Sequence, residues 1–484
     1  MDTHCLIFIN CISLLLLFIV LAFWRNTRRQ LYAPEIFDLV AFFTSSKIIL
    51  YFLLPAILRG YSDWAKDKVI GATPVEIANV YTIEFISLIV WMVCILLTLR
   101  ITRVGRPIAN INHGGKSMWL GNNASIITER TAKLFMMVVC LLYLIFFPYT
   151  YEESLNLSLG KGSLIQPVMM LAGPVVGLYL FARGRKPAGN ILFGLGMVVV
   201  VLSMMAAFGG GSRGQIMFAA LWLLFLYFFV TRKKYILYSC VAGVALVLLA
   251  HDIMLQIRAQ PDLLDQPYKE RAIGMARALS TEKNESDLIG SLEFRFGVAS
   301  RMSVAFLRLV NDGQSAGFKP IMSSLYAMIP RKYFPDKPIQ GSVDGTMQGM
   351  GMYIINIVME GSGMMSEFFT GVHAYWELGL PGVFLFSSLS GIFIALCIGY
   401  FGRFASAGLP LMMIMLKPPW LETKLWIAET IADVFHTLVP LIVLWYLIRF
   451  VVARVSREQK ENIGIGASPG ANASAGTLGR QNGR

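Results

Sequence analysis

The sequence predicts an all-α polytopic membrane protein, with about eleven transmembrane helices and one long helical loop outside the membrane. Composition is the first reason. Apolar residues make up 56% of the 484 residues and charged residues only 15%, against about 25% charged in a typical soluble domain. The second reason is the recurrence of apolar stretches near the ~20 residues that span a bilayer. The third is that basic connections alternate with less basic ones. These features exclude a cytosolic enzyme, a secreted disulfide scaffold and a disordered chain.

The predicted spans form two groups, separated by the long loop. We expect the first group at residues 5–24, 37–58, 77–99, 133–149, 164–182, 188–208, 215–230 and 235–254, and the second at 381–402, 404–419 and 432–453. Residues 5–24 lack a basic start and a cleavage site, so we interpret them as a spanning helix rather than a removable signal. Prolines interrupt 404–419, which could instead be a re-entrant pair.

The charges between the spans indicate how the chain is oriented. Clusters of Lys and Arg follow the first, third, fifth, seventh and last predicted spans, and the connections between them are poorer in base or balanced by acid. Cationic connections stay on the cytoplasmic side, so we expect the N-terminus outside and the C-terminus inside. The same rule accounts for the excess of 42 Lys and Arg over 29 Asp and Glu. Because the basic residues are explained by the topology, we expect no nucleic-acid partner.

Four regions follow from this topology. Residues 1–250 hold the first group of helices, 251–380 form the outer loop, 381–460 hold the last helices, and 461–484 form a Gly-, Ala- and Ser-rich tail that we expect to be disordered in the cytoplasm. The outer loop carries 12 Lys and Arg against 14 Asp and Glu, unlike the basic cytoplasmic connections. Loops of this length usually carry function.

Arginine residues on the outer side are the main candidates for binding phosphate. Arg213 lies in GGGSRGQ (209–215), a hairpin between two predicted spans. Its glycines let backbone N–H groups approach a ligand, and a guanidinium binds phosphate oxygens in pairs. The alternative is a tight turn with an arginine that reaches the membrane interface.

Further basic residues lie in the outer loop. Arg301 and Arg308 are seven residues apart, so a helix would place them on one face, beside aromatic residues. They could alternatively pair with Glu293 or Asp312. The proline-rich segment MIPRKYFPDKP (328–338) would hold more basic groups in a stiff arc. The predicted diphosphate-binding residues are Arg213, Arg258, Arg295, Arg301, Arg308, Arg331, Lys332 and Lys337.

Residues 366–382, SEFFTGVHAYWELGLPG, hold the candidate general base on a helix that approaches the span 381–402. His373 and Glu377 are four residues apart and can face the same way, so the carboxylate could orient the imidazole. Activation of a sugar hydroxyl needs a carboxylate or imidazole within hydrogen-bond reach, and the catalytic candidates are Glu367 and His373. Ordinary interfacial polar residues are the alternative. No Walker A, HExxH or GxSxG motif occurs, so we expect no cofactor and no metal.

Over about residues 205–400, the hairpin SRG, the loop motif IPR…FPDKP and ELGLPG before a helix together resemble the Wzy-type oligosaccharide repeat-unit polymerases of O-antigen and capsule synthesis. Those polymerases are distantly related to the O-antigen ligases. The resemblance implies a C-type glycosyltransferase-like membrane fold in the bacterial inner membrane. It also implies two undecaprenyl-diphosphate-linked glycans as substrates. A sugar hydroxyl of one glycan would attack the anomeric carbon of the other with inversion, without a metal, and lipid diphosphate would leave.

The resemblance also implies the partners, which are membrane lipids, a chain-length regulator protein and the upstream flippase. Two other functions stay open. An O-antigen ligase would pass finished glycan to a lipid core and would share the donor chemistry. A flippase or transporter of lipid-linked sugars would place its charges along a path through the membrane rather than in an outer loop.

Overall fold

The computed structural model describes residues 3–28, 48–54, 72–102, 303–327, 369–402 and 439–465, with single positions between 37 and 47, 130 and 145, 191 and 202, 238 and 242, and 329 and 334. Within these residues every regular element is a helix, and no strand occurs. Three of the helices are long and apolar enough to cross a membrane, at Ile7–Thr27, Pro74–Ile101 and Thr370–Gly399. The predicted class of helical membrane protein is therefore supported.

The described helices agree with several predicted spans. The elements are α1 (Thr3–Arg28), the π-helix η1 (Ile48–Leu53), α4 (Pro74–Ile101), α12 (Lys319–Ala327), α14 (Thr370–Gly402) and α18 (Val439–Ile465). Helices α1 and α4 contain the predicted spans 5–24 and 77–99, and η1 lies within 37–58. Single helical positions fall in 133–149, 188–208 and 235–254. The predicted spans 164–182, 215–230 and 404–419 lie outside the described residues.

Local sequence explains where α4 begins. The hydroxyl of Thr73 accepts a hydrogen bond from the backbone N–H of Glu76, and the Glu76 carboxylate accepts one from the backbone N–H of Thr73. This capping box satisfies two N–H groups that a helix start leaves without an intrahelical acceptor. Pro74 occupies the first turn, where its missing N–H is harmless.

Helix α18 extends further than the sequence pattern predicts. The predicted span ends at 453 and the predicted tail begins at 461, but the helix continues to Ile465. An ion pair four residues apart, Arg454 Nε to Glu458 Oε1 at 3.2 Å, supports the polar part of the helix. The Trp445 ring packs edge-to-face on Phe135, with 5.6 Å between the ring centroids.

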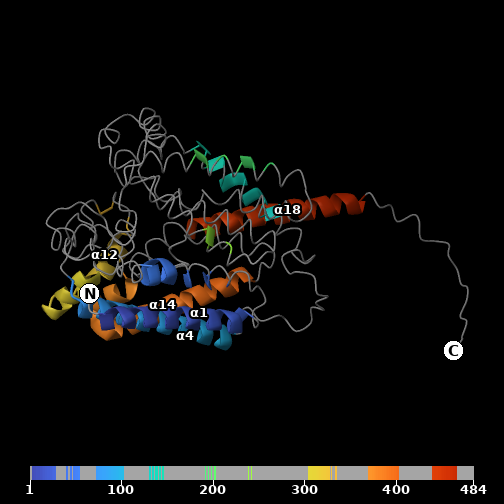
Figure 1. The fold of residues 1–484 in the computed structure, drawn as a ribbon. Coiled ribbons are helices and arrows are strands. Elements are labelled where there is room, and N and C mark those ends of the chain that lie inside the picture. The colour runs from blue at the N-terminus through green and yellow to red at the C-terminus, as the bar shows by residue number, and fades with distance from the viewer. Residues whose placement is uncertain are drawn as a thin grey trace, which may run out of the picture.

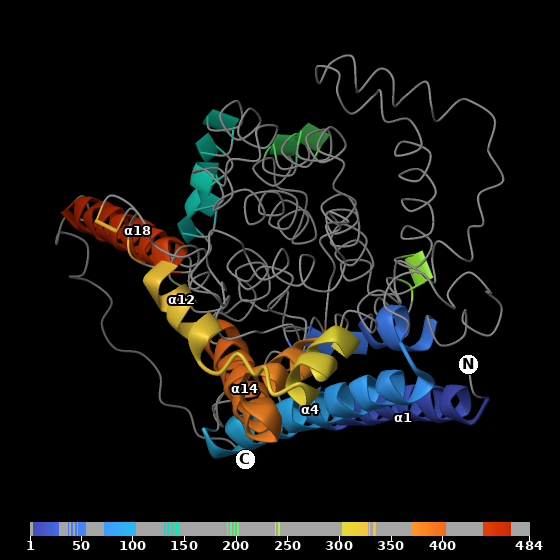
Figure 2. The ribbon, with the colours of Figure 1, turned by 90° about the vertical axis from the view of Figure 1, so that its left-hand side faces the viewer.

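Helices α1, α4 and α14 lie together, and α18 lies apart from them (Figures 1 and 2). Helix α4 packs against α14 and also against α1. Small residues allow a close approach to α14. The Ser87 and Ser387 hydroxyls are 2.8 Å apart, and a Cβ on Gly391 would lie 2.6 Å from the Trp91 carbonyl oxygen. Small residues and interhelical hydrogen bonds are typical of helix contacts in membranes.

Helix α14 is broken at ELGLPG, which the sequence pattern places just before a span. Leu378 and Gly379 have non-helical backbone angles, and Gly379 has φ 67° and ψ −155°, a region that essentially only glycine adopts. Pro381 follows and provides no N–H to the turn before it. We call the two pieces the half-helix 370–377 and the long piece 380–402.

The chain folds back at this break. Gly371 in the half-helix and Ser387 in the long piece both contact Ser87 of α4. In a straight helix these two residues would be about 24 Å apart. Ala374 packs on Phe386 across the turn. The half-helix and the long piece therefore form a helical hairpin beside the middle of α4, which the sequence pattern did not predict.

Candidate functional site

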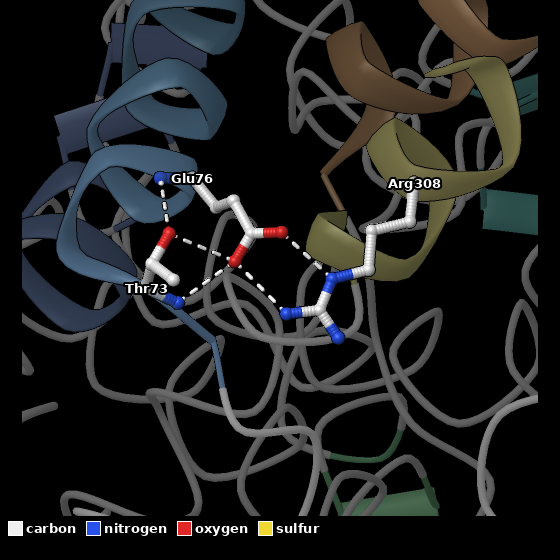
Figure 3. Close-up of polar contacts among 3 residues, drawn as sticks. All are labelled: Thr73, Glu76 and Arg308. Carbon is white, nitrogen blue, oxygen red and sulfur yellow. Dashed lines mark hydrogen bonds and ion pairs between the residues drawn. The ribbon is translucent and has the colours of Figure 1, made fainter. Parts of the chain in front are cut away.

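Two carboxylates of α4 bind charged side chains from other parts of the chain. The first, Glu76, lies at the N-terminal end of the helix. Arg308 belongs to the helical residues 303–311 and forms two hydrogen bonds to Glu76. Its Nε lies 2.7 Å from Oε1 and its Nη2 lies 2.9 Å from Oε2 (Figure 3). This paired arrangement is the strongest geometry between a guanidinium and a carboxylate. The side chains remain 39% and 24% exposed, respectively.

The Glu76 carboxylate is itself held in place by Thr73. Its Oε2 accepts hydrogen bonds from the Thr73 backbone N–H at 2.7 Å and from the Thr73 hydroxyl at 2.9 Å (Figure 3). The capping box thus orients the carboxylate before Arg308 binds it. The hydrogen bonds to Glu76 raise the pKa of Arg308 above its ordinary value, so the guanidinium stays charged.

The structure gives Arg308 a carboxylate partner, Glu76, that the sequence pattern did not offer. The backbone N–H of Asp312 donates a hydrogen bond to the Arg308 carbonyl oxygen, and Glu293 lies outside the described residues. Glu76 is 232 residues away in the chain. Sequence reasoning missed Glu76, although Thr73-Pro74-Val75-Glu76 matches the capping-box pattern that predicts an oriented carboxylate.

The second carboxylate, Glu84, lies deeper along α4. Its Oε1 is 2.8 Å from Lys47 Nζ, and the two side chains are 0% and 2% exposed. Its Oε2 accepts a hydrogen bond of 2.6 Å from the backbone N–H of Gly371. A carboxylate at the start of a helix is favoured by the helix dipole. Glu84 therefore joins three separate helical segments inside the predicted membrane region.

His373 and Glu377 form the pair that their spacing predicts. The distance from His373 Nδ1 to Glu377 Oε1 is 3.5 Å, and both side chains are fully buried. The imidazole packs edge-to-face against Phe306 at 5.1 Å and Trp376 at 5.4 Å between ring centroids. The spacing argument is confirmed, but the pair faces the interior rather than the solvent.

The segment 303–317 holds the half-helix in place. The Ser303 hydroxyl accepts a hydrogen bond from the Phe369 N–H at 2.9 Å. At the other end, the Gly317 N–H donates to the Glu377 carbonyl oxygen at 3.0 Å. The same segment carries Arg308 and, two residues earlier, the Phe306 that contacts His373. One helical turn thus connects the exposed ion pair to the buried histidine.

Two of the predicted site residues, Arg308 and His373, belong to the part of the chain that the structure describes. The other eight lie outside it: Glu367, Arg213, Arg258, Arg295, Arg301, Arg331, Lys332 and Lys337. Among the described residues, no three His, Cys, Asp or Glu side chains gather into a group that could hold a metal ion.

Comparison with known proteins identifies a family. No curated protein matches the chain, and no solved structure matches it. A family profile matches residues 122–400, which is more than half of the chain and includes Arg308, His373 and Glu377. The chain therefore belongs to the family described as a domain of unknown function, DUF8712.

Proposed function

We propose that the protein polymerises undecaprenyl-diphosphate-linked oligosaccharide repeat units on the periplasmic face of the bacterial inner membrane. The observation that carries the proposal is Arg308, a guanidinium held in a fixed orientation and partly exposed at the end of an apolar helix. The resemblance of residues 205–400 to Wzy-type polymerases supplies the reaction class. A fixed arginine suits the phosphate groups of a lipid-linked substrate at the membrane surface.

The reaction is an inverting glycosyl transfer. A terminal hydroxyl of one glycan attacks the anomeric carbon of the other, the bond from that carbon to the diphosphate breaks, and lipid diphosphate leaves. Arg308, with the other predicted arginines, stabilises the negative charge that develops on the diphosphate. Glu367 or His373 takes the proton of the attacking hydroxyl. For His373 this requires the half-helix to move away from Phe306, because the imidazole is buried.

The proposed fold is C-type glycosyltransferase-like, with about eleven spans, the N-terminus outside and the C-terminus inside. In this topology the beginning of α4 and the loop 251–380 lie on the same outer side of the membrane. The hydrogen bonds from Arg308 to Glu76 join these two parts, which supports placing them on one side of the membrane.

A transporter of lipid-linked sugars is the second candidate, and the buried pair of Lys47 and Glu84 favours it. Ionisable residues inside a membrane often mark the path of an ion or substrate. An O-antigen ligase shares the donor chemistry of the polymerase and differs in the acceptor.

Polymer length tests the proposal. In cells that depend on this protein for their surface polysaccharide, Arg213→Ala, Arg308→Ala and Arg331→Ala should leave single repeats in place of long chains. Arg454→Ala, which removes an exposed arginine from α18, is the control and should leave the chain-length ladder unchanged. Unchanged ladders in all three loop variants would overturn the assignment.

Purified protein separates the three functions. With synthetic lipid-linked repeats, a polymerase lengthens the glycan, with or without a chelator. A ligase consumes preformed polymer without lengthening it. A transporter moves the lipid-linked glycan across proteoliposomes without forming a glycosidic bond.

A further inference from the structure

The ion pair between Arg308 and Glu76 is asymmetric in how its two members are held. Glu76 belongs to the first turn of α4, and two donors of Thr73 fix its carboxylate. Arg308 reaches this fixed carboxylate from a different part of the chain. The carboxylate therefore presents a fixed acceptor to the guanidinium.

This arrangement prepares the arginine for a ligand. An arginine side chain has many rotamers, and fixing it when a ligand arrives weakens binding. Here the side chain is fixed on folding, through Nε and Nη2. With 39% of its surface exposed, the Arg308 side chain is reachable from the solvent.

We propose that Glu76 is a positioning residue, which holds the Arg308 guanidinium in the orientation that contacts a phosphate group of a lipid at the membrane surface. The inference rests on the proposed function for its ligand, a lipid-linked diphosphate. Phosphate in a phospholipid headgroup has the same chemistry, so the test compares the two sources. Glu76 acts through Arg308 and does not touch the ligand.

The test measures binding to the full-length protein in nanodiscs, with undecaprenyl diphosphate as one probe and phosphatidylglycerol as the other. Arg308→Ala should weaken binding of undecaprenyl diphosphate by about tenfold or more, the effect of losing hydrogen bonds to a charged group. Glu76→Gln should weaken it by about threefold to tenfold, because glutamine can cap Thr73 but is neutral and has one acceptor oxygen in place of the two that the guanidinium binds. Arg308→Lys should not restore binding, because an ammonium lacks the planar fork.

A double variant separates positioning from a general effect on folding. If Glu76 acts through Arg308, adding Glu76→Gln to Arg308→Ala should cause no further loss of affinity. The matched controls are Arg454→Ala and Glu458→Gln, which make the same charge changes in an exposed ion pair on α18. Both should bind within twofold of the unchanged protein.

Each result supports or overturns the inference. If Glu76→Gln binds as tightly as the unchanged protein, or more tightly, Glu76 does not position Arg308 and the inference is wrong. A loss confined to phosphatidylglycerol keeps the positioning role but assigns the site to phospholipid headgroups, which counts against the proposed function. If binding of undecaprenyl diphosphate depends on both residues but no polymer forms, the proposed function fails and the inference stands. If polymer forms and Glu76→Gln binds normally, the inference alone fails.

Discussion

Helix α4 carries two carboxylates, each bound to a basic side chain from another part of the chain, and the two pairs differ in their surroundings. Glu84 and Lys47 are almost completely buried, whereas Glu76 and Arg308 remain partly exposed. The buried carboxylate uses its second oxygen to accept a hydrogen bond from the half-helix. The exposed one uses its second oxygen for Thr73 and Arg308.

The comparison separates a structural pair from a pair that a ligand can reach. Water screens the partly exposed pair more than the buried one, so it adds less to the free energy of folding. The buried pair has lost its water, and removing one partner leaves a charge in an apolar environment. We therefore expect large effects on stability at Glu84 and small ones at Glu76, with the effects on ligand binding in the opposite order.

The largest expected effect follows from Glu84→Ala. The variant removes the carboxylate that pairs with Lys47 and accepts the hydrogen bond of the Gly371 N–H. The free energy of unfolding should therefore fall by about 3–5 kcal/mol. Unfolding in mixed lipid–detergent micelles measures it. The double variant Lys47→Met with Glu84→Leu should lose less, because it leaves no buried charge. A loss below about 1 kcal/mol in Glu84→Ala would show that the buried pair of Glu84 and Lys47 does not stabilise the fold.

The next effect concerns the hairpin that brings the half-helix to Glu84. A Cβ on Gly382 would clash with the Ala374 carbonyl oxygen and lie 2.9 Å from Leu378 Cβ. Gly382→Ala should therefore lower the free energy of unfolding by about 1–3 kcal/mol. Gly194 is the matched control: it is helical and nothing lies within 4 Å of its Cβ position. Gly194→Ala should be neutral or slightly stabilising. Equal effects at both positions would contradict the hairpin.

A smaller effect is expected where α4 and α14 meet at Ser87 and Ser387. Their hydroxyls form one hydrogen bond, 2.8 Å long. Interhelical hydrogen bonds in membrane proteins contribute about 0.6 kcal/mol on average. A double-mutant cycle with alanine at both positions should give a coupling energy of about this size. A coupling energy of zero would show that this hydrogen bond adds nothing to the contact between the two helices.

A small effect on stability is also expected at Glu76, in contrast to Glu84. Glu76→Gln keeps the cap on Thr73, so the free energy of unfolding should change by less than about 1 kcal/mol. Thermal unfolding in detergent measures it, beside Glu458→Gln in the exposed pair of α18. A loss as large as that of Glu84→Ala would mean that the Arg308 pair holds the fold together rather than presenting a ligand site.

Part of this structure could be predicted because it depends on neighbouring residues. Apolar runs of the right length predicted α1 and α4, and the spacing of His373 and Glu377 predicted their contact. The extension of α18 to Ile465 was missed, because a run of polar residues looks like the end of a span even when it continues as a helix. The diphosphate-binding role of the eight predicted basic residues, Arg308 included, stays a prediction.

The sequence by itself determined the helical, apolar character of this chain and where α1 and α4 run, because these properties depend on composition and on spacings of a few residues. The tertiary structure decided that Arg308 binds Glu76 and that the half-helix folds back to Glu84. Such contacts join residues that are hundreds of positions apart. They depend on how helices pack in space, and no local pattern of residues records that packing.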